Sequence, residues 1–234
     1  MGASAALKSR PSAEADGAEA MLRVALSLFV EQGYHGASMR DIAARAGVSV
    51  SAAYHYFPSK ADMLRTIMVR VTEDLIADLE AARDTAGPDP AARLAAIARA
   101  HVLLHTRRQD ESFIGNSELR SLSPADRRKV VTLRDRVGQI FKDVVAEGCQ
   151  RGAFSQPYSA ETARAILTMC TAVAGWYRAA GPDRPEIIAE RYAALALRLV
   201  GADLPFPLRG RERATVAARE SPEPSASEAR VRRS

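Results

Sequence analysis

Recurring helix start and stop signals divide most of this sequence into helices. Four times a Ser or Asp stands three residues before an acidic residue, an arrangement that caps helix N-termini: Asp16 with Glu19, Ser38 with Asp41, Ser59 with Asp62, and Ser123 with Asp126. Glycines that can end helices follow at Gly33, Gly47, Gly87, Gly152, Gly181 and Gly201. No stretch alternates apolar and polar residues with a period of two, so no strand is expected. The sequence therefore predicts an all-α fold.

These signals predict about nine helices in two parts. The expected helices lie near residues 17–32, 39–46, 50–56, 60–86, 90–108, 111–121, 124–151, 160–180 and 185–200. The first three are expected to form a compact unit over residues 16–62, and the rest a helical body over residues 63–205. The ends, residues 1–15 and 206–234, are rich in Ala, Ser, Pro and Arg and lack an apolar face, so we expect a disordered arm and a disordered tail.

Composition places the chain among folded proteins of the cytoplasm. Hydrophobic residues make up 47% of its 234 residues, which is enough to bury a core. No apolar run reaches the roughly 18 residues of a membrane span, and the N-terminus lacks the apolar stretch of a signal peptide. Cys149 and Cys170 have no CxxC spacing and are expected to be buried thiols. The sequence therefore predicts no membrane association.

Net charge permits an anionic partner but does not locate it. The formal charge is +5, yet residues 1–62 hold six basic and six acidic residues. Residues 206–234 hold seven arginines against four glutamates. A nucleic-acid site in the first 62 residues must therefore be a local patch.

The segment from Met39 to Tyr56 has the pattern of two helices joined by a tight turn. Ala43 is small where the second helix crosses, Gly47 permits a left-handed turn, and Val48 can fill the corner. This pattern predicts a helix-turn-helix, whose second helix fits the major groove of DNA. The alternative is an ordinary helical hairpin that does not touch DNA.

The outward face of the second helix favours DNA binding over the plain hairpin. A purely structural helix would present Glu and Lys there, whereas this one presents Ser49, Ser51, Tyr54 and His55. Short hydroxyls and hydrogen-bonding rings suit base edges, thymine methyl groups and phosphates.

The stretch LFVEQGYHGASMRDIAARAGVSVSAAYHYFPSKADML closely resembles the DNA-binding domain of the TetR family of bacterial transcriptional regulators, over roughly residues 20–66. The resemblance implies that Ser38, Tyr56 and Lys60 touch phosphates. It implies contacts with bases, or with bases and phosphates, for Arg40, Val50, Ser51, Tyr54 and His55. The family often has Lys or Gln at position 50 and Gly or Pro at position 51, so the details of base reading stay open.

The body shows no catalytic constellation. His101 and His105 stand four residues apart in HVLLH, which lacks the glutamate and the third ligand of a zinc hydrolase. We expect solvated or core histidines, and we expect no catalytic residue, metal or cofactor. A helical enzyme with a vestigial helix-turn-helix is the alternative from another functional class, and turnover of a bound ligand would reveal it.

The last two expected helices predict a homodimer. AETARAILTMCTAVAGWYRAAG and PEIIAERYAALALRLVG combine small residues with more apolar surface than one exposed pair of helices can carry. Pairing with a twofold mate into a four-helix bundle would cover that surface. The resemblance implies the same arrangement, and a dimer suits a pseudo-palindromic double-stranded DNA operator.

Segments of the body resemble TetR-type regulators of lipid and steroid breakdown that sense acyl-CoA thioesters. The similarity lies in NSELRSL and in the GWYRAAG segment near the end of the eighth helix. An apolar cavity and polar groups at its mouth are expected from Phe113, Ile114, Asn116, Arg120, Arg134, Phe141, Met169, Trp176, Tyr177 and Arg178. The expected function is a ligand-responsive dimeric repressor. A regulator of an efflux or other metabolic operon with a hydrophobic non-CoA ligand, an activator, and a regulator without a ligand remain alternatives.

Overall fold

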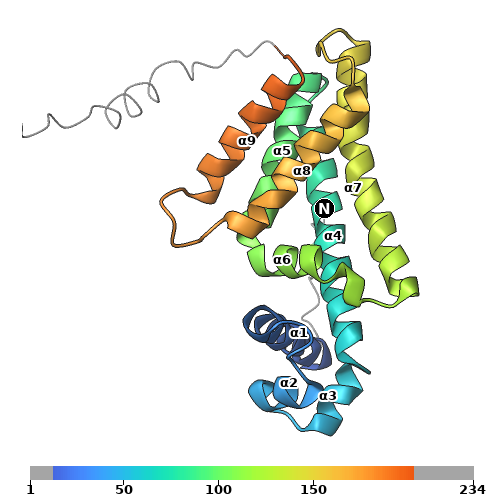
Figure 1. Ribbon diagram of the computed structural model, residues 1–234, viewed down its shortest axis with the longest axis vertical. Helices are drawn as coiled ribbons and strands as arrows, with labels where there is room; N and C mark the ends of the chain where they lie inside the picture. The colour runs from blue at the N-terminus through green and yellow to red at the C-terminus, as the bar shows by residue number, and fades with distance from the viewer. Residues whose placement is uncertain (1–12, 203–234) are drawn as a thin grey trace, which may run out of the picture. The chain divides into compact units, whose positions relative to one another are not determined.

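The computed structural model describes residues 13–202, which form nine α-helices and one short 3-10 helix and contain no strand (Figure 1). The elements are α1 (Ala13–Gln32), α2 (Met39–Ala46), α3 (Val50–Tyr56), α4 (Lys60–Thr85), α5 (Pro90–Arg107), α6 (Gln109–Ser117), η1 (Leu119–Ser121), α7 (Pro124–Gln150), α8 (Ser159–Trp176) and α9 (Pro185–Leu199). The predicted all-α fold with about nine helices is confirmed.

Three element ends differ from the prediction. The first helix begins at Ala13, so residues 13–15 are helical; the rest of the predicted arm and the predicted tail lie outside the described residues. The helix expected over residues 111–121 is α6 followed by η1. Helix α8 ends at Trp176, before Gly181, because Tyr177 has a non-helical backbone, with φ of −55° and ψ of 145°, and buries its side chain in the core.

One apolar cluster holds the first three helices against the start of α4. Its centre is built from α1 and the helix pair that follows, and Phe29, Ile42 and Ala53 are almost fully buried in it. Met63, Leu64, Ile67 and Met68 extend this cluster along α4. Ile114 of α6, Leu122 just after η1 and Val130 of α7 also enter it. The packing of the front unit therefore continues past residue 62 and includes residues of the body.

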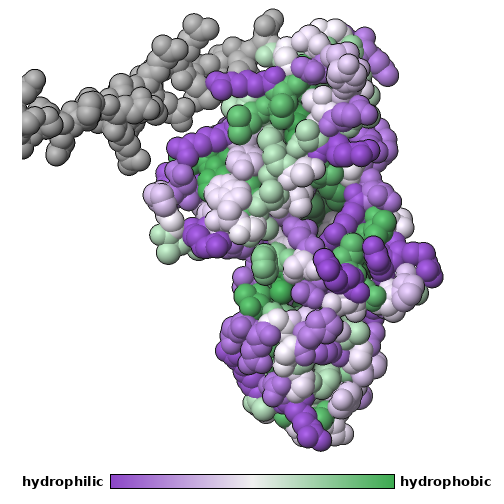
Figure 2. Space-filling model, viewed as in Figure 1, coloured by the Kyte–Doolittle hydropathy of each residue, from purple (hydrophilic) through white to green (hydrophobic). Residues whose placement is uncertain are grey.

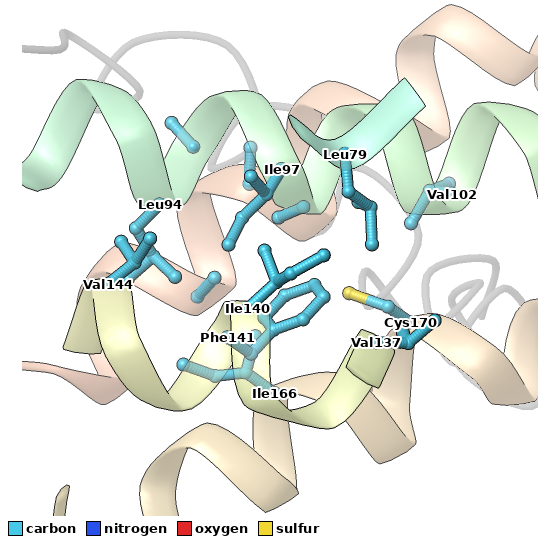
Figure 3. Close-up of a cluster of buried hydrophobic side chains, with 14 of the residues drawn as sticks. Leu79, Leu94, Ile97, Val102, Val137, Ile140, Phe141, Val144, Ile166 and Cys170 are labelled. Carbon is cyan, nitrogen blue, oxygen red and sulfur yellow. The ribbon is translucent and has the colours of Figure 1, made fainter. Parts of the chain in front are cut away.

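A second apolar cluster forms the core of the body. Figure 3 shows Phe141 at the centre of side chains from α4, α5, α7 and α8, among them Leu79, Ile97 and Ile166. Helix α9 packs mainly against α5. The two clusters divide within α4, between Met68 and Val71, so this one helix connects them. No helix in the described part of the chain is long and apolar enough to cross a membrane.

Candidate DNA interface and effector cavity

Local capping and one glycine fix the geometry of α2 and α3. Ser38 and Asp41 form a reciprocal capping box at the start of α2, as the sequence predicts. Gly47 ends the helix with φ of 69°, a left-handed conformation that disfavours a side chain. Ala43 and Ala53 are fully buried where the two helices meet. The pair is therefore a helix-turn-helix.

Most of the predicted DNA-binding residues are exposed. Tyr54, half exposed at 50%, and Val50, at 39%, project from α3. The other exposed members of the predicted set are Ser38, Arg40, Ser49, Ser51 and His55. The oxygens of Ser38 and Ser49 also accept backbone N–H groups at the two helix starts, so these residues cap as well as face outward. Their contacts with DNA stay a prediction.

Two of the residues predicted to contact phosphates interact with other parts of the protein. Tyr56 is half-buried, and its phenol lies against α1: a Cβ built on Gly17 would stand 2.5 Å from the Tyr56 hydroxyl oxygen. The Lys60 ammonium donates to the carbonyl oxygens of Tyr34 and Ala37, each at 2.8 Å. Both residues thus hold the front unit together, and any contact they make with DNA comes in addition to this role.

A cavity of about 170 Å³ lies in the body beneath α6. Five helices line it with an apolar set and a polar set. The apolar set is Val71, Leu75, Leu104, Val137 and Leu167. The polar set is Thr72, His101, His105, Ser112, Asn116, Arg134 and Thr171, together with Gly115.

The two histidines of the cavity are neutral core residues. Their rings stack with centroids 4.3 Å apart, and both are buried. Burial lowers the pKa of His101 well below its usual value, with a further contribution from His105. Burial also lowers the pKa of His105 to about 4, assisted by the charge of Arg134 and opposed by a hydrogen bond to the His101 carbonyl. The sequence predicted either solvated or core histidines, and the structure places both in the core.

Of the ten predicted ligand residues, the structure brings Asn116 and Arg134 to this cavity. Phe113 and Trp176 are instead exposed, at 45% and 48%. Arg120 and Arg178 are exposed as well. Ile114 lies in the front cluster, whereas Phe141, Met169 and Tyr177 belong to the core of the body. A ligand role for these eight residues stays a prediction.

Sequence reasoning missed most of the cavity lining. His101, Ser112 and Thr171 come from three different helices, and none stands in a recognisable ligand motif. The one available signal was the spacing of His101 and His105, which places two polar rings on the same face of one helix.

Helix α6 belongs to both candidate sites. Ser112, Gly115 and Asn116 line the cavity, while Ile114 is buried in the front cluster with 2% exposure. At its first residue, Gln109 donates to the carbonyl oxygens of Ala174 and Tyr177 at the end of α8. A nine-residue helix therefore connects the cavity, the front unit and the end of α8.

The outer faces of α8 and α9 carry small and apolar side chains. On α8 the exposed residues include Ala165, Thr168, Ala172, Gly175 and Trp176. On α9 they include Ile187, Leu195 and Leu199. Figure 2 shows green and pale side chains over both helices on the face viewed there.

A helix-turn-helix with an exposed face, joined to a larger helical body, is the architecture of a DNA-binding regulator of transcription. Comparison with known families agrees. Residues 21–67 match the family of bacterial regulatory proteins named after TetR, and residues 87–200 match the tetracyclin repressor-like C-terminal domain. A TetR family transcriptional regulator, PfmR from Thermus thermophilus, is 32% identical, with a TM-score of 0.72 over 76% of this chain and 97% of that one. The chain belongs to the TetR family of transcriptional regulators.

Two further relatives have informative names. The transcriptional repressor KstR2 of Mycolicibacterium smegmatis is 25% identical over 189 residues, which are 80% of this chain and 92% of that protein. AibR, whose structure is known in complex with isovaleryl coenzyme A and operator DNA, is 24% identical, with a TM-score of 0.70 over 80% of this chain and 100% of that one. The likeness to AibR shows the fold alone. KstR2 and PfmR are regulators of transcription.

Proposed function

We propose that this protein is a homodimeric repressor that binds a pseudo-palindromic operator and leaves it when a small molecule fills the cavity beneath α6. The observation that carries the proposal is the double role of α6. Its Ser112 and Asn116 line the cavity, and its Ile114 packs in the core of the helix-turn-helix unit. A ligand that displaces α6 must therefore also displace the front unit.

Contacts made by the segments that follow α6 along the chain, η1 and the start of α7, support this coupling. In η1, the hydroxyl oxygen of Ser121 lies 3.3 Å from Nε2 of His35, which belongs to the connection that precedes α2. Arg65 of α4 pairs with Asp126 of α7 at 3.4 Å. Movement of α6 would be transmitted through such links to α3, whose spacing from its twofold mate has to match successive major grooves. The ligand can shift this equilibrium only by its difference in affinity between the two states.

Dimerisation is proposed through α8 and α9. Their exposed faces offer Ala172 and Gly175 for close approach and Leu195 and Leu199 for apolar burial. Two such pairs form a four-helix bundle around a twofold axis. The Gln109 bonds tie the end of α8 to α6, so the dimer seam also connects to the cavity.

The effector class proposed is an acyl-CoA thioester of lipid or steroid breakdown. The similarity of the NSELRSL and GWYRAAG segments to regulators of that kind supports this choice. The apolar set of the cavity suits a hydrocarbon group, although 170 Å³ has room for an acyl group and not for coenzyme A itself. A hydrophobic non-CoA ligand of an efflux or other metabolic operon is the second candidate, because an apolar wall would accept it equally well. The role requires no chemical step, and the protein would act in the cytoplasm, on chromosomal DNA.

Footprinting of the DNA upstream of the protein's own gene and of neighbouring operons, followed by gel shifts, tests the proposal. We expect a protected pseudo-palindrome and its release by particular thioesters. The arms are acyl-CoAs of increasing length, the matching free acids, and coenzyme A alone. Failure to protect any such site would refute the repressor function. Release by unrelated hydrophobic compounds, with all thioesters inert, would refute the effector class only.

A further inference from the structure

The cavity contains a cation without an anionic partner. Arg134 of α7 lines the cavity, and its Nη2 donates to the carbonyl oxygen of Gly115 at 2.6 Å. No carboxylate among the described residues pairs with this guanidinium, and burial alone lowers its pKa. Arginine nevertheless keeps its charge in proteins, so the cavity retains a poorly solvated positive charge. Arg134 is partly buried, and it borders the cavity rather than a carboxylate.

Two more polar groups of the same cavity lack partners. The Nδ1 atom of His101 and the hydroxyl oxygen of Ser112 are buried and form no hydrogen bond within residues 13–202. Both side chains are more than nine-tenths buried, and both residues line the cavity. Native structures rarely leave such groups unsatisfied, but both atoms are closed off from water-sized groups in the cavity as well, so neither reaches a ligand there without moving.

Both groups can act as donors. The Ser112 hydroxyl can donate or accept. The Nε2 atom of His101 lies 3.1 Å from the Thr171 hydroxyl oxygen, which can donate to it. In that tautomer the proton of the neutral His101 ring is on Nδ1. Of these groups, the guanidinium of Arg134 is the donor that the cavity offers to an oxyanion, and the hydroxyl and the imidazole N–H lie behind the cavity wall.

The rest of the lining limits the size of the ligand. Val71, Leu75 and Leu104 lie among the apolar residues, so the anionic group must be attached to hydrocarbon. A volume of 170 Å³ equals the share of about six waters in the liquid and is below the range of pockets for drug-sized ligands. A short, branched or monocyclic hydrocarbon is the size that fits.

We propose that the cavity recognises a carboxylate on a short hydrocarbon, with the Arg134 guanidinium donating to the carboxylate oxygens. The ligand is a small free acid or an acyl-CoA whose acyl chain ends in a second carboxylate, because both present the same group. A thioester with a neutral hydrocarbon end leaves the guanidinium unpaired. This inference rests on the proposed function only for its consequence, the release of DNA.

Isothermal titration calorimetry on the DNA-free protein tests the inference directly. The probes are hexanoate, benzoate, hexanamide, butyryl-CoA, glutaryl-CoA and coenzyme A alone. We expect hexanoate or benzoate to bind at least tenfold more tightly than hexanamide, which has the same size and no charge, or glutaryl-CoA to exceed butyryl-CoA by the same factor. The first result identifies a free acid, and the second a carboxylate-ended thioester. Equal binding of the charged and neutral members of both pairs, or tighter binding of butyryl-CoA, overturns the inference.

Variants connect the preference to the named residues. Arg134→Met should remove the preference for the charged probe, and Arg134→Lys should keep part of it. Ser112→Ala, whose hydroxyl lies behind the cavity wall, is the control and should keep the full preference. Thermal melting without ligand identifies variants that fail to fold, and the comparison of wild-type probes does not depend on them. An Arg134→Met protein that folds and keeps the full preference overturns the assignment.

Separate readouts distinguish this inference from the proposed function. Operator binding is followed by fluorescence anisotropy, and cavity binding by calorimetry. Operator binding with no carboxylate preference would overturn the inference and leave the repressor function intact. A carboxylate preference without binding to any operator would support the inference and refute the repressor function.

Discussion

The ammonium nitrogen of Lys60 lies 4.5 Å from the centre of the Tyr34 ring and 2.8 Å from the carbonyl oxygen of the same residue. Tyr34 is buried next to Phe29, and burial raises the pKa of its phenol. A second bond of 2.8 Å joins Lys60 to the carbonyl oxygen of Ala37. The first residue of α4 thus satisfies the backbone of the connection between α1 and α2, and this contact positions the helix-turn-helix on α4.

Lys60→Ala should destabilise the protein as well as weaken its binding to DNA. The change leaves partly buried carbonyl oxygens without a charged donor, a loss of about 1.5–3 kcal/mol. Urea denaturation measures this loss. Affinity for operator and random DNA should fall by a similar factor, because the contact is not with bases. An unchanged free energy of unfolding would show that these bonds contribute nothing.

Arg40→Ala is the matched control for Lys60, because Arg40 is exposed on α2. Its removal should change the free energy of unfolding by less than about 0.5 kcal/mol. Discrimination between operator and random DNA should decrease by roughly 1–3 kcal/mol, and Tyr54→Ala should act in the same way. Competition gel shifts measure the ratio of affinities. Equal losses on both DNAs would refute base reading by these residues.

Ala172→Glu or Leu195→Glu should separate the dimer into monomers that lose the operator. Both residues are exposed on the outer faces of α8 and α9, where a new charge would be buried in the proposed seam without a partner. Light scattering should show the mass falling from twice 25.2 kDa to 25.2 kDa. Ala81→Glu, at an exposed position of α4, is the control and should stay dimeric. A monomeric wild-type protein with full affinity for one half-site would contradict the proposal.

Stability should decrease as the pH falls below about 6.5, the usual pKa of histidine. In the unfolded chain His105 takes up a proton near that pH, whereas in the folded protein it does so only near pH 4. Between these values the unfolded state binds more protons, so the free energy of unfolding rises with pH. The stabilisation by the neutral His105 ring is fully present above about pH 6.5 and is lost as the pH falls to about 4.

Each buried histidine contributes a slope of at most about 1.4 kcal/mol per pH unit in that window. His105→Gln should reduce the slope, and His101→Gln should do the same because burial also lowers the pKa of His101. Urea denaturation at about pH 5, 6 and 7 gives the slopes. Identical slopes in the wild type and both variants would exclude the histidines as its source.

The sequence by itself determined the helices and the helix-turn-helix. The Ser38–Asp41 capping box and the left-handed turn at Gly47 are where the pattern predicts them, because capping and turn geometry depend on residues within one turn of helix. For the same reason the exposure of Tyr54 and Ser51 on α3 followed from helical periodicity in a short, well-defined unit.

Only the tertiary structure decided which side chains share the cavity. His101, Ser112 and Arg134 meet because α5, α6 and α7 cross there, whereas Ile114, on the same helix as Ser112, belongs to the other core. Trp176 was expected in the cavity and is half exposed, since α8 ends at that residue. Periodicity indicates that a helix face is covered, but the covering partner depends on how distant helices pack, and that information is not local in the sequence.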